Sequence, residues 1–272
     1  MNYKLIAFDM DDTLLNGQGK MSKENHDALD DLVSQGVQIV LCSGRPTSVL
    51  LGNARALLGE KQGEYIISFN GGVVCSVATG EELVRIPMLP EGGKIVLEAA
   101  RKKGVLVQAY LGSDFYVEID DPRAQKYSQG LSMAYSVVND LMTIINQGSL
   151  KLLLNGPREK LLEIEKELTP LAPGNFTMAF SKPEYLEFVH PQVHKGTGIE
   201  ALARILGLSV DQTIGVGDSY NDIEMLRTAG LGIAVANAKP EVKEVADIVL
   251  DSSNEESIVL EIRRRFFDSQ EV

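Results

Sequence analysis

The chain has 272 residues, of which 44% are hydrophobic and 24% charged, and its formal net charge is −12 at pH 7. This length allows one large domain or two ordinary ones, and the ordinary composition excludes a disordered chain. The acidic balance excludes a general nucleic-acid or anionic-membrane binder, although a metal ion could still reverse the local field for an anionic small substrate.

The N-terminal sequence and the cysteines indicate the expected compartment. Met1 leads almost at once into an apolar run, without the basic and apolar regions of a secretory signal. No apolar run reaches the length of a membrane span, and Cys42 and Cys75 lack metal-ligand spacing. We therefore expect a cytoplasmic protein with buried free thiols, no membrane or nucleic-acid partner, and an oligomeric state that the sequence leaves open.

Short apolar runs alternate with amphipathic, helix-length segments in the first part of the chain, which is typical of a parallel α/β sheet. Ser22 predicts the N-cap of a helix over 23–35, and Pro46 predicts the start of the next helix. The apolar runs that predict strands here are 3–8, 37–42 and 65–69.

The middle of the chain has its own set of predicted elements. Helices are expected near 91–103 and 158–168. The strand-like runs of this segment are 105–110, 115–119, 150–155, 176–180 and 185–189. Prolines lie near its two ends, at positions Pro87, Pro90 and Pro191.

After this segment the first pattern resumes, with a helix expected near 197–206. The strands expected in this last part are 213–217, 231–236 and 247–250. We interpret 84–190 as a second α/β domain that is inserted into a core formed by 1–83 and 191–272.

Polar side chains follow three of the predicted core strands. Asp9 and Asp11 follow the first strand, Ser43 follows the second, and Asp218 follows the run over 213–217. Ligands of open parallel sheets bind beyond the carboxyl ends of the strands, so we expect these groups to converge. Carboxylates from two strands are suited to Mg²⁺, and the cation would offset the repulsion among neighbouring negative charges.

These residue types suit phosphoryl transfer. The carboxylate of Asp9 can attack phosphorus and form an aspartyl-phosphate, while Asp11 can pass a proton to the leaving alkoxide and take one from water. Mg²⁺ would shield the phosphate charge, so that an anionic nucleophile can approach. Ser43 can donate to a phosphoryl oxygen, and Lys195 can neutralise the charge that develops in the transition state.

Four sequence motifs, in the order DMDDT, LCSGR, KGTG and GDSYND, resemble those of the haloacid dehalogenase superfamily. The inserted segment resembles the type IIB cap of Cof-type, YidA-like sugar phosphatases, as do the stretches NGG at 70–72, SKPEYLEFVHPQVHKGTG and GIAVANA. The resemblance implies a Rossmann-like, doubly wound parallel sheet core with an inserted α/β cap domain that sets substrate specificity.

The resemblance also implies a Mg²⁺-dependent phosphatase that hydrolyses phosphate monoesters of small metabolites, above all sugar phosphates, through an aspartyl-phosphate. Asp9 would be the nucleophile and Asp11 the general acid/base. Asp9, the backbone carbonyl of Asp11, and Asp218 would bind Mg²⁺, and Asn221 and Asp222 would support it.

The phosphate-binding residues implied by the resemblance come from the second and third motifs and the NGG stretch. Ser43 and Lys195 would hold the phosphate, together with backbone groups near Gly44, Asn70 and Gly71.

One position departs from the commonest form of the first motif, because Asp12 stands where Gly is usual. Gly at this place gives backbone freedom in the turn after the strand. Among other residues Asp is one of the more tolerant of left-handed conformations. We therefore predict that Asp12 shapes the turn and takes no part in the chemistry.

Other functions remain open at the level of sequence. A phosphomutase or phosphotransferase would share the aspartyl-phosphate step, and a non-catalytic, receiver-like phospho-acceptor also gathers carboxylates at a sheet edge. Such a receiver is about half this size or less, however, and needs no inserted cap. Dinucleotide-binding and phosphate-loop motifs are rejected, because Tyr220 replaces the required third Gly and Ile95 replaces the required Ser or Thr.

A few further residues allow two interpretations. Arg45 could be a structural ion-pair partner, and Tyr185 and Glu187 of the insert could face either substrate or solvent. Pro191 disfavours a regular helical metal-binding pair of His190 and His194, so we expect these histidines to be polar linker residues.

Overall fold

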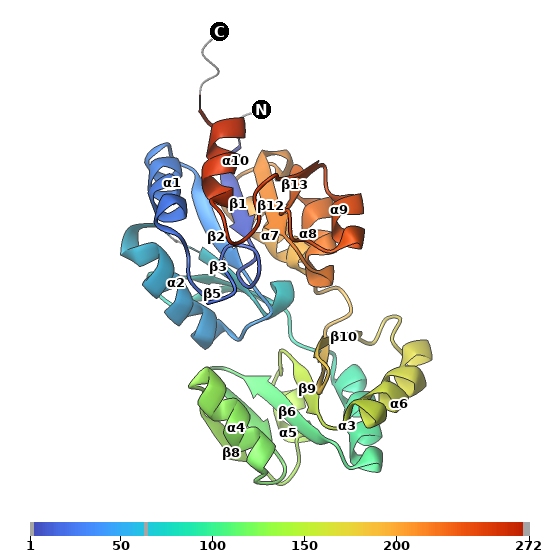
Figure 1. Ribbon diagram of the computed structural model, residues 1–272. Coiled ribbons are helices and arrows are strands. Elements are labelled where there is room, and N and C mark those ends of the chain that lie inside the picture. The colour runs from blue at the N-terminus through green and yellow to red at the C-terminus, as the bar shows by residue number, and fades with distance from the viewer. Residues whose placement is uncertain (1–2, 63–64, 269–272) are drawn as a thin grey trace. The chain divides into compact units, whose positions relative to one another are not determined.

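The computed structural model describes residues 3–62 and 65–268 (Figure 1). Contacts within the chain divide it into two compact units, Met1–Val84 with His194–Val272, and Arg85–Val193. We call these the core unit and the inserted unit. Among the described residues, no helix has the length and apolar character that a membrane span requires.

Eight strands among the described residues form the sheet of the core unit. They are β1 (Leu5–Phe8), β2 (Gln38–Cys42), β3 (Tyr65–Ser68), β4 (Val73–Ser76), β5 (Glu82–Arg85), β12 (Thr213–Gly217), β13 (Leu231–Ala234) and β14 (Ile248–Val249). Their order is β14-β13-β12-β1-β2-β3-β4-β5, and the pairs from β14 to β3 are parallel. The predicted α/β class is confirmed.

One edge of this sheet departs from the parallel pattern, because β4 pairs antiparallel with β3. A short 3-10 turn, Phe69–Gly71, connects the two strands directly. A parallel pair would need a crossover connection of a dozen or more residues, which this turn cannot supply. The sheet is therefore mixed, with its parallel strands on the side that carries the first and last core motifs.

The strands that precede the predicted site residues are neighbours in the sheet. β1 lies between β12 and β2, and Phe8 is in register with both of them. The carboxyl ends of the three strands therefore lie side by side, which places together the residues that follow them: Asp9, Ser43 and Asp218. This confirms the predicted adjacency of the strands.

Helices of the core unit form two packed groups. The first contains α1 (Lys23–Ser34), α2 (Thr47–Gln62) and α10 (Ile258–Phe266), and α1 lies beside α10 (Figure 1). The second contains α7 (Lys195–Ile205), α8 (Ile223–Thr228) and α9 (Pro240–Val245). Ser22 caps α1 by accepting the backbone N–H of Asn25, as predicted. Cys42 and Cys75 are buried free thiols, as predicted.

Six strands in the described residues of the inserted unit form a second sheet, in the order β10-β11-β9-β6-β7-β8. They are β6 (Leu106–Leu111), β7 (Asp114–Val117), β8 (Tyr135–Val137), β9 (Leu152–Asn155), β10 (Thr177–Lys182) and β11 (Tyr185–Val189). The helices are α3 (Pro90–Lys103), α4 (Pro122–Leu131), α5 (Met142–Asn146) and α6 (Arg158–Leu168).

The inserted unit has its own hydrophobic core. Side chains of α3, α5 and α6 pack with side chains of β6, β9 and β11, among them Leu97, Ile145, Ile164, Leu152 and Phe188. Full burial of such a side chain is worth about 1.5–3 kcal/mol relative to leaving it exposed. The inserted segment is therefore a structural unit with a core of its own, and not an extended loop.

Candidate active site

The turn after β1 is held by backbone and side-chain hydrogen bonds. The Asp9 N–H donates to the Val216 carbonyl at 2.9 Å, and the Leu14 N–H donates back to the Asp9 carbonyl at 3.3 Å. The fully buried Thr13 donates its hydroxyl to Oδ1 of Asp218 at 2.7 Å. This turn therefore joins the end of β1 to the loop after β12.

Asp12 adopts the left-handed conformation that the sequence predicts for the turn, with φ of 60°. Its carbonyl accepts the side-chain amide of Asn237 at 2.7 Å. The side chain of Asp12 is exposed, so the residue contributes its backbone shape to the turn.

Asp12→Gly is expected to keep kcat/KM within about twofold of the wild type, because Gly adopts a left-handed conformation without strain. Asp12→Val should lower both activity and the unfolding temperature, since a β-branched residue is strained at positive φ. Phosphate release and thermal unfolding measure the two effects. Equal behaviour of the Gly and Val variants would contradict this role for the backbone.

Among the described residues, Asp9, Asp218 and Asp222 form a buried carboxylate cluster. One oxygen of each lies within 4.8 Å of the others, and the three residues are 7%, 8% and 0% exposed. Carboxylate oxygens are the ligands that hard divalent cations prefer. Three negative charges in a buried place also need compensation. The residues present therefore fit a metal ion.

Lys195, the first residue of α7, lies inside the same cluster and is 0% exposed. Its ammonium donates to Oδ1 of Asp9 and, at 2.5 Å, to Oδ1 of Asp222. Burial lowers the pKa of Lys195, but the carboxylates of Asp222 and Asp9 outweigh burial, so the pKa lies above its ordinary value. The lysine therefore remains a cation at neutral pH.

Asp222 is held in the cluster by hydrogen bonds to both of its carboxylate oxygens. Its Oδ2 accepts the backbone N–H groups of Asp218 at 3.0 Å and Ser219 at 2.9 Å, while its Oδ1 accepts Lys195. A Cβ on Gly217 would lie 2.5 Å from Cβ of Asp222, so the close approach of this loop requires Gly there. Both oxygens of Asp222 are thus engaged within the protein, and they orient Lys195 and the start of the loop.

Burial acts on the protonation of the other two carboxyl groups. It raises the pKa of Asp9 to about 8, against the lowering effect of Lys195. It raises the pKa of Asp218 to about 6, against the lowering effect of the Thr13 hydrogen bond. Burial therefore favours the protonated forms of both groups, and a bound cation would favour their charged forms by displacing protons.

The second motif and the NGG stretch meet beside this cluster. Ser43 is 4% exposed, and a Cβ on Gly44 would lie 3.0 Å from the side-chain amide of Asn70. Asn221 donates its side-chain amide to Oδ1 of Asn70 at 3.2 Å. Asn70 therefore links the loop after β2 to the loop after β12.

The backbone of this stretch is strained. Phe69 and Asn70 have φ of 50° and 56°, and Gly71 has φ of 102°. A Cβ on Gly71 would lie 2.1 Å from the carbonyl oxygen of His194, so only Gly fits against the start of α7. Non-glycine residues at positive φ cost free energy and concentrate at functional sites. This observation favours a functional role for the NGG stretch.

His194 caps α7, a structural role that was not predicted from the sequence. Its ring Nδ1 accepts the backbone N–H of Thr197 at 3.3 Å, and the Thr197 hydroxyl donates to the His194 carbonyl at 2.5 Å. The pair forms a capping box at the N-terminus of α7, directly before Lys195. A polar residue with Thr three positions later was the available signal, although Ser or Thr is the usual cap.

Arg45 forms an ion pair, as one of its two interpretations from the sequence allowed, and its partner is Asp11, which was not predicted. Nε of Arg45 lies 3.2 Å from Oδ2 of Asp11, and Nη2 lies 2.7 Å from Oδ1.

In the inserted unit, Glu187 accepts the ammonium of Lys151 at 3.1 Å and the Ser181 hydroxyl at 2.7 Å. The Glu187 carboxylate is therefore bound within the protein rather than extended into solvent.

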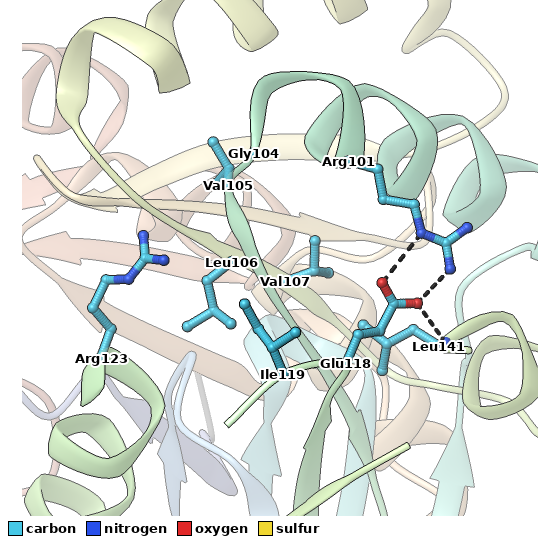
Figure 2. Close-up of a pocket in the computed structure, with 9 residues that line it drawn as sticks. All are labelled: Arg101, Gly104, Val105, Leu106, Val107, Glu118, Ile119, Arg123 and Leu141. Carbon is cyan, nitrogen blue, oxygen red and sulfur yellow. Dashed lines mark hydrogen bonds and ion pairs between the residues drawn. The ribbon is translucent and has the colours of Figure 1, made fainter. Parts of the chain in front are cut away.

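A pocket of about 160 Å³ lies in the inserted unit, and Figure 2 shows the residues that line it. Arg101 hydrogen-bonds Glu118 there and pairs with Asp140 at 2.8 Å. Arg123, on the other side of the pocket, pairs with Asp121 at 2.8 Å. Because both guanidinium groups already carry carboxylate partners, the pocket is poorly suited to a phosphate group.

The predicted site residues all belong to the core unit.

Comparisons with known proteins agree with this geometry. The family model for haloacid dehalogenase-like hydrolases matches residues 6–262. YxeH of Bacillus subtilis is 29% identical over 264 residues, which cover 94% of this chain and 96% of the relative. The HMP-PP phosphatase of Serratia proteamaculans is 27% identical over 245 residues, which cover 89% and 87% of the two chains.

A solved structure matches nearly the full length of the chain. The crystal structure of a haloacid dehalogenase-like hydrolase from Bacteroides thetaiotaomicron matches with a TM-score of 0.84 and 32% identity, covering 97% of this chain and 100% of the other. The motifs, the adjacent strand ends and the buried carboxylates are thus accompanied by similarity over nearly the whole chain. The chain therefore belongs to the haloacid dehalogenase-like hydrolases, as its motifs predicted, and is a phosphatase of small phosphorylated metabolites.

Proposed function

We propose that this phosphatase is Mg²⁺-dependent and hydrolyses phosphate monoesters of small metabolites, foremost sugar phosphates, through an aspartyl-phosphate on Asp9. The observation that carries the proposal is the position of Asp9. Its buried carboxylate accepts the ammonium of Lys195 and shares a cluster with Asp218, which lies at the end of a neighbouring strand. A nucleophilic carboxylate, a fixed cation and oxygen ligands for a metal thus lie within one small volume.

In the proposed first step, an Asp9 oxygen forms a bond to phosphorus while the bond from phosphorus to the ester oxygen breaks. Asp11 gives its proton to the leaving alkoxide. In the second step, Asp11 takes a proton from water as the water oxygen attacks phosphorus, which releases inorganic phosphate and restores Asp9. Lys195 and Ser43 balance the charge on the phosphoryl oxygens, with backbone groups near Gly44, Asn70 and Gly71.

Asp9, Asp218 and the backbone carbonyl of Asp11 are the proposed Mg²⁺ ligands, since hard cations prefer oxygen donors. When bound, Mg²⁺ would shield the phosphate charge from the attacking carboxylate. Asn221 and Asp222 would act as supports. The hydrogen bonds that Asp222 accepts from two backbone N–H groups and from Lys195 favour this indirect role.

The stabilisation by Mg²⁺ is expected to grow as the pH rises from about 5 to about 8. Burial raises the pKa of Asp9 to about 8 and that of Asp218 to about 6, above the value of 3.8 for a free Asp. Both groups therefore favour the folded state at low pH, and this contribution is lost as the pH rises through these values. A bound cation replaces the protons and offsets the loss.

Thermal unfolding with Mg²⁺ and with EDTA, at pH values across this interval, measures the effect. Sodium chloride at matched ionic strength is the control for charge screening. A difference between the Mg²⁺ and EDTA curves that does not change with pH would contradict the displacement of protons from these carboxyl groups.

Residues 84–190 are the proposed cap domain, which selects the leaving group. The separate hydrophobic core of the inserted unit supports this, because a self-contained unit can vary its surface without disturbing the catalytic residues. Exchange of this segment for that of a relative should change the rank order of substrates more than the dependence on Mg²⁺. An unchanged rank order would count against the proposed role.

The proposed function is tested by a phosphate-release screen over phosphorylated metabolites that includes sugar phosphates and HMP-PP. The Asp9→Asn variant and EDTA serve as controls. Sustained release that needs Mg²⁺ and Asp9 is the expected result. Interconversion of sugar phosphates without release of phosphate would replace hydrolysis by a mutase reaction, and a single stoichiometric phosphorylation would replace it by a phospho-acceptor.

A further inference from the structure

The guanidinium of Arg45 forms a bidentate ion pair with the carboxylate of Asp11, through Nε and Nη2. Nε lies 3.2 Å from Oδ2 of Asp11, and Nη2 lies 2.7 Å from Oδ1 and 3.0 Å from Oδ2. A two-pronged pair of this kind fixes both the direction and the rotation of the carboxylate, which a single contact cannot do.

The arginine is itself held in place from three sides. Its third nitrogen, Nη1, donates to Oδ1 of Asn53 on α2 at 2.9 Å. Its backbone N–H donates to Oγ of Ser43 at 3.3 Å, and its carbonyl accepts the Phe69 N–H at 3.1 Å. Arg45 therefore starts from the loop that carries Ser43 and reaches across to the loop that carries Asp11.

Stabilisation of the fold is a weak explanation for this pair. The Arg45 side chain is 31% exposed and that of Asp11 is 58% exposed. Exposed ion pairs of this kind contribute little to the free energy of unfolding, because solvent screens the attraction and both side chains lose freedom. The geometry of the pair, on the other hand, fixes the carboxylate of Asp11, which carries out both proton transfers in the proposed mechanism.

We propose that Arg45 is the positioning residue for Asp11. It holds the Asp11 carboxyl group in the orientation from which a proton passes to the leaving oxygen and, in the second step, is taken from water. Asn53 contributes by bracing the guanidinium. This inference rests on the acid–base role of Asp11 in the proposed function.

The proposal predicts a loss that depends on the leaving group. An alkoxide leaves a sugar phosphate readily only when it receives a proton, whereas p-nitrophenolate leaves without one. Arg45→Gln should therefore lower kcat/KM for a sugar phosphate by about tenfold or more, and for p-nitrophenyl phosphate by less than about twofold. The value of kcat/KM is the right readout, because it reports the steps up to phosphorylation of Asp9.

The second step provides an independent readout. If Arg45 also orients Asp11 for water activation, hydrolysis of the aspartyl-phosphate slows in Arg45→Gln. Rapid mixing with p-nitrophenyl phosphate should then show a burst of p-nitrophenol close to one per enzyme, followed by slow turnover. Absence of a burst, together with equal losses for both substrates, would overturn the proposal.

Three companion variants separate positioning from other roles. Arg55→Gln removes an arginine from the same helix as Asn53, and should leave both substrates unaffected. Asn53→Ala should reproduce the effect of Arg45→Gln in direction but more weakly. Arg45→Lys keeps the positive charge but cannot form the bidentate pair, so its sugar-phosphate activity should lie between that of Arg45→Gln and that of the wild type.

A double variant separates this inference from the proposed function. Arg45→Gln added to Asp11→Asn should cost nothing further if Arg45 acts through Asp11, and additive losses would overturn it. A raised inhibition constant for inorganic phosphate would instead make Arg45 a phosphate ligand, which also overturns it. Full activity of Asp11→Asn would contradict the proposed acid–base role itself. An inactive Asp11→Asn together with a fully active Arg45→Gln would contradict only this inference.

Discussion

An Asp9→Asn enzyme is expected to lose phosphate release by about 10⁴-fold or more while keeping its fold. An amide oxygen is a far weaker nucleophile than a carboxylate, and the proposed aspartyl-phosphate cannot form on it. The substitution is nearly isosteric, so the amide oxygen can still accept the hydrogen bond that Lys195 donates to Oδ1.

The fold should tolerate this change because the substitution is nearly isosteric and Lys195 keeps Asp222 as its carboxylate partner. Asp9 is 7% exposed, and burial raises its pKa to about 8, so the folded protein favours a neutral group at this position. The unfolding temperature at neutral pH should therefore stay the same or rise. Steady-state phosphate release gives the activity, and thermal unfolding gives the stability.

Asp12→Asn is a matched control for this prediction. It removes a carboxylate three residues away by the same chemical change, and Asn tolerates the left-handed conformation that Asp12 adopts. Full activity of Asp12→Asn with none in Asp9→Asn is the expected pattern. An Asp9→Asn enzyme that turns over normally would end the assignment of the nucleophile.

Lys195→Met should abolish activity and also lower the free energy of unfolding by about 3–5 kcal/mol at neutral pH, which is the typical cost of breaking a buried ion pair. The side chain is 0% exposed and donates to both Asp9 and Asp222. Its removal leaves the carboxylate cluster without its internal cation. Denaturant unfolding and phosphate release measure the two losses.

The pH should modulate this destabilisation in a defined direction. Without Lys195 the buried carboxyl groups can become neutral by binding protons, and they do so more readily at low pH. The difference in stability between the wild type and Lys195→Met should therefore shrink as the pH falls from about 8 to about 5. A difference that grows toward low pH would contradict the attribution to unpaired carboxylates.

Lys151→Met provides a comparison within the same chain. Lys151 is 2% exposed and pairs with Glu187 at 3.1 Å, so it is also a buried lysine with a carboxylate partner, but it lies in the inserted unit. Its loss should also destabilise the protein, yet Mg²⁺-dependent hydrolysis of p-nitrophenyl phosphate should persist at temperatures where the variant is folded. If Lys151→Met had no activity, the loss of activity in Lys195→Met could be explained by the loss of a buried lysine from the fold alone.

Much of the core could be predicted because its signals are local. The apolar run 37–42 corresponds to β2, Ser22 caps α1, and the run 213–217 is β12. In the inserted unit, β8 was not predicted. It has three residues, Tyr135–Val137, and its last two are exposed, so it offers too short an apolar pattern to recognise.

The chemical groups at the strand ends and the family of the chain could be recognised without coordinates, since both depend on the order of residues along the chain. The partners of these groups became known from the folded chain: Lys195 with Asp9 and Asp222, Thr13 with Asp218, and Arg45 with Asp11. These pairs join residues 27 to 205 positions apart. Hydrogen bonds act over about 3 Å, so strand register and loop conformation, rather than local pattern, select one partner among the many polar groups at the same edge of the sheet.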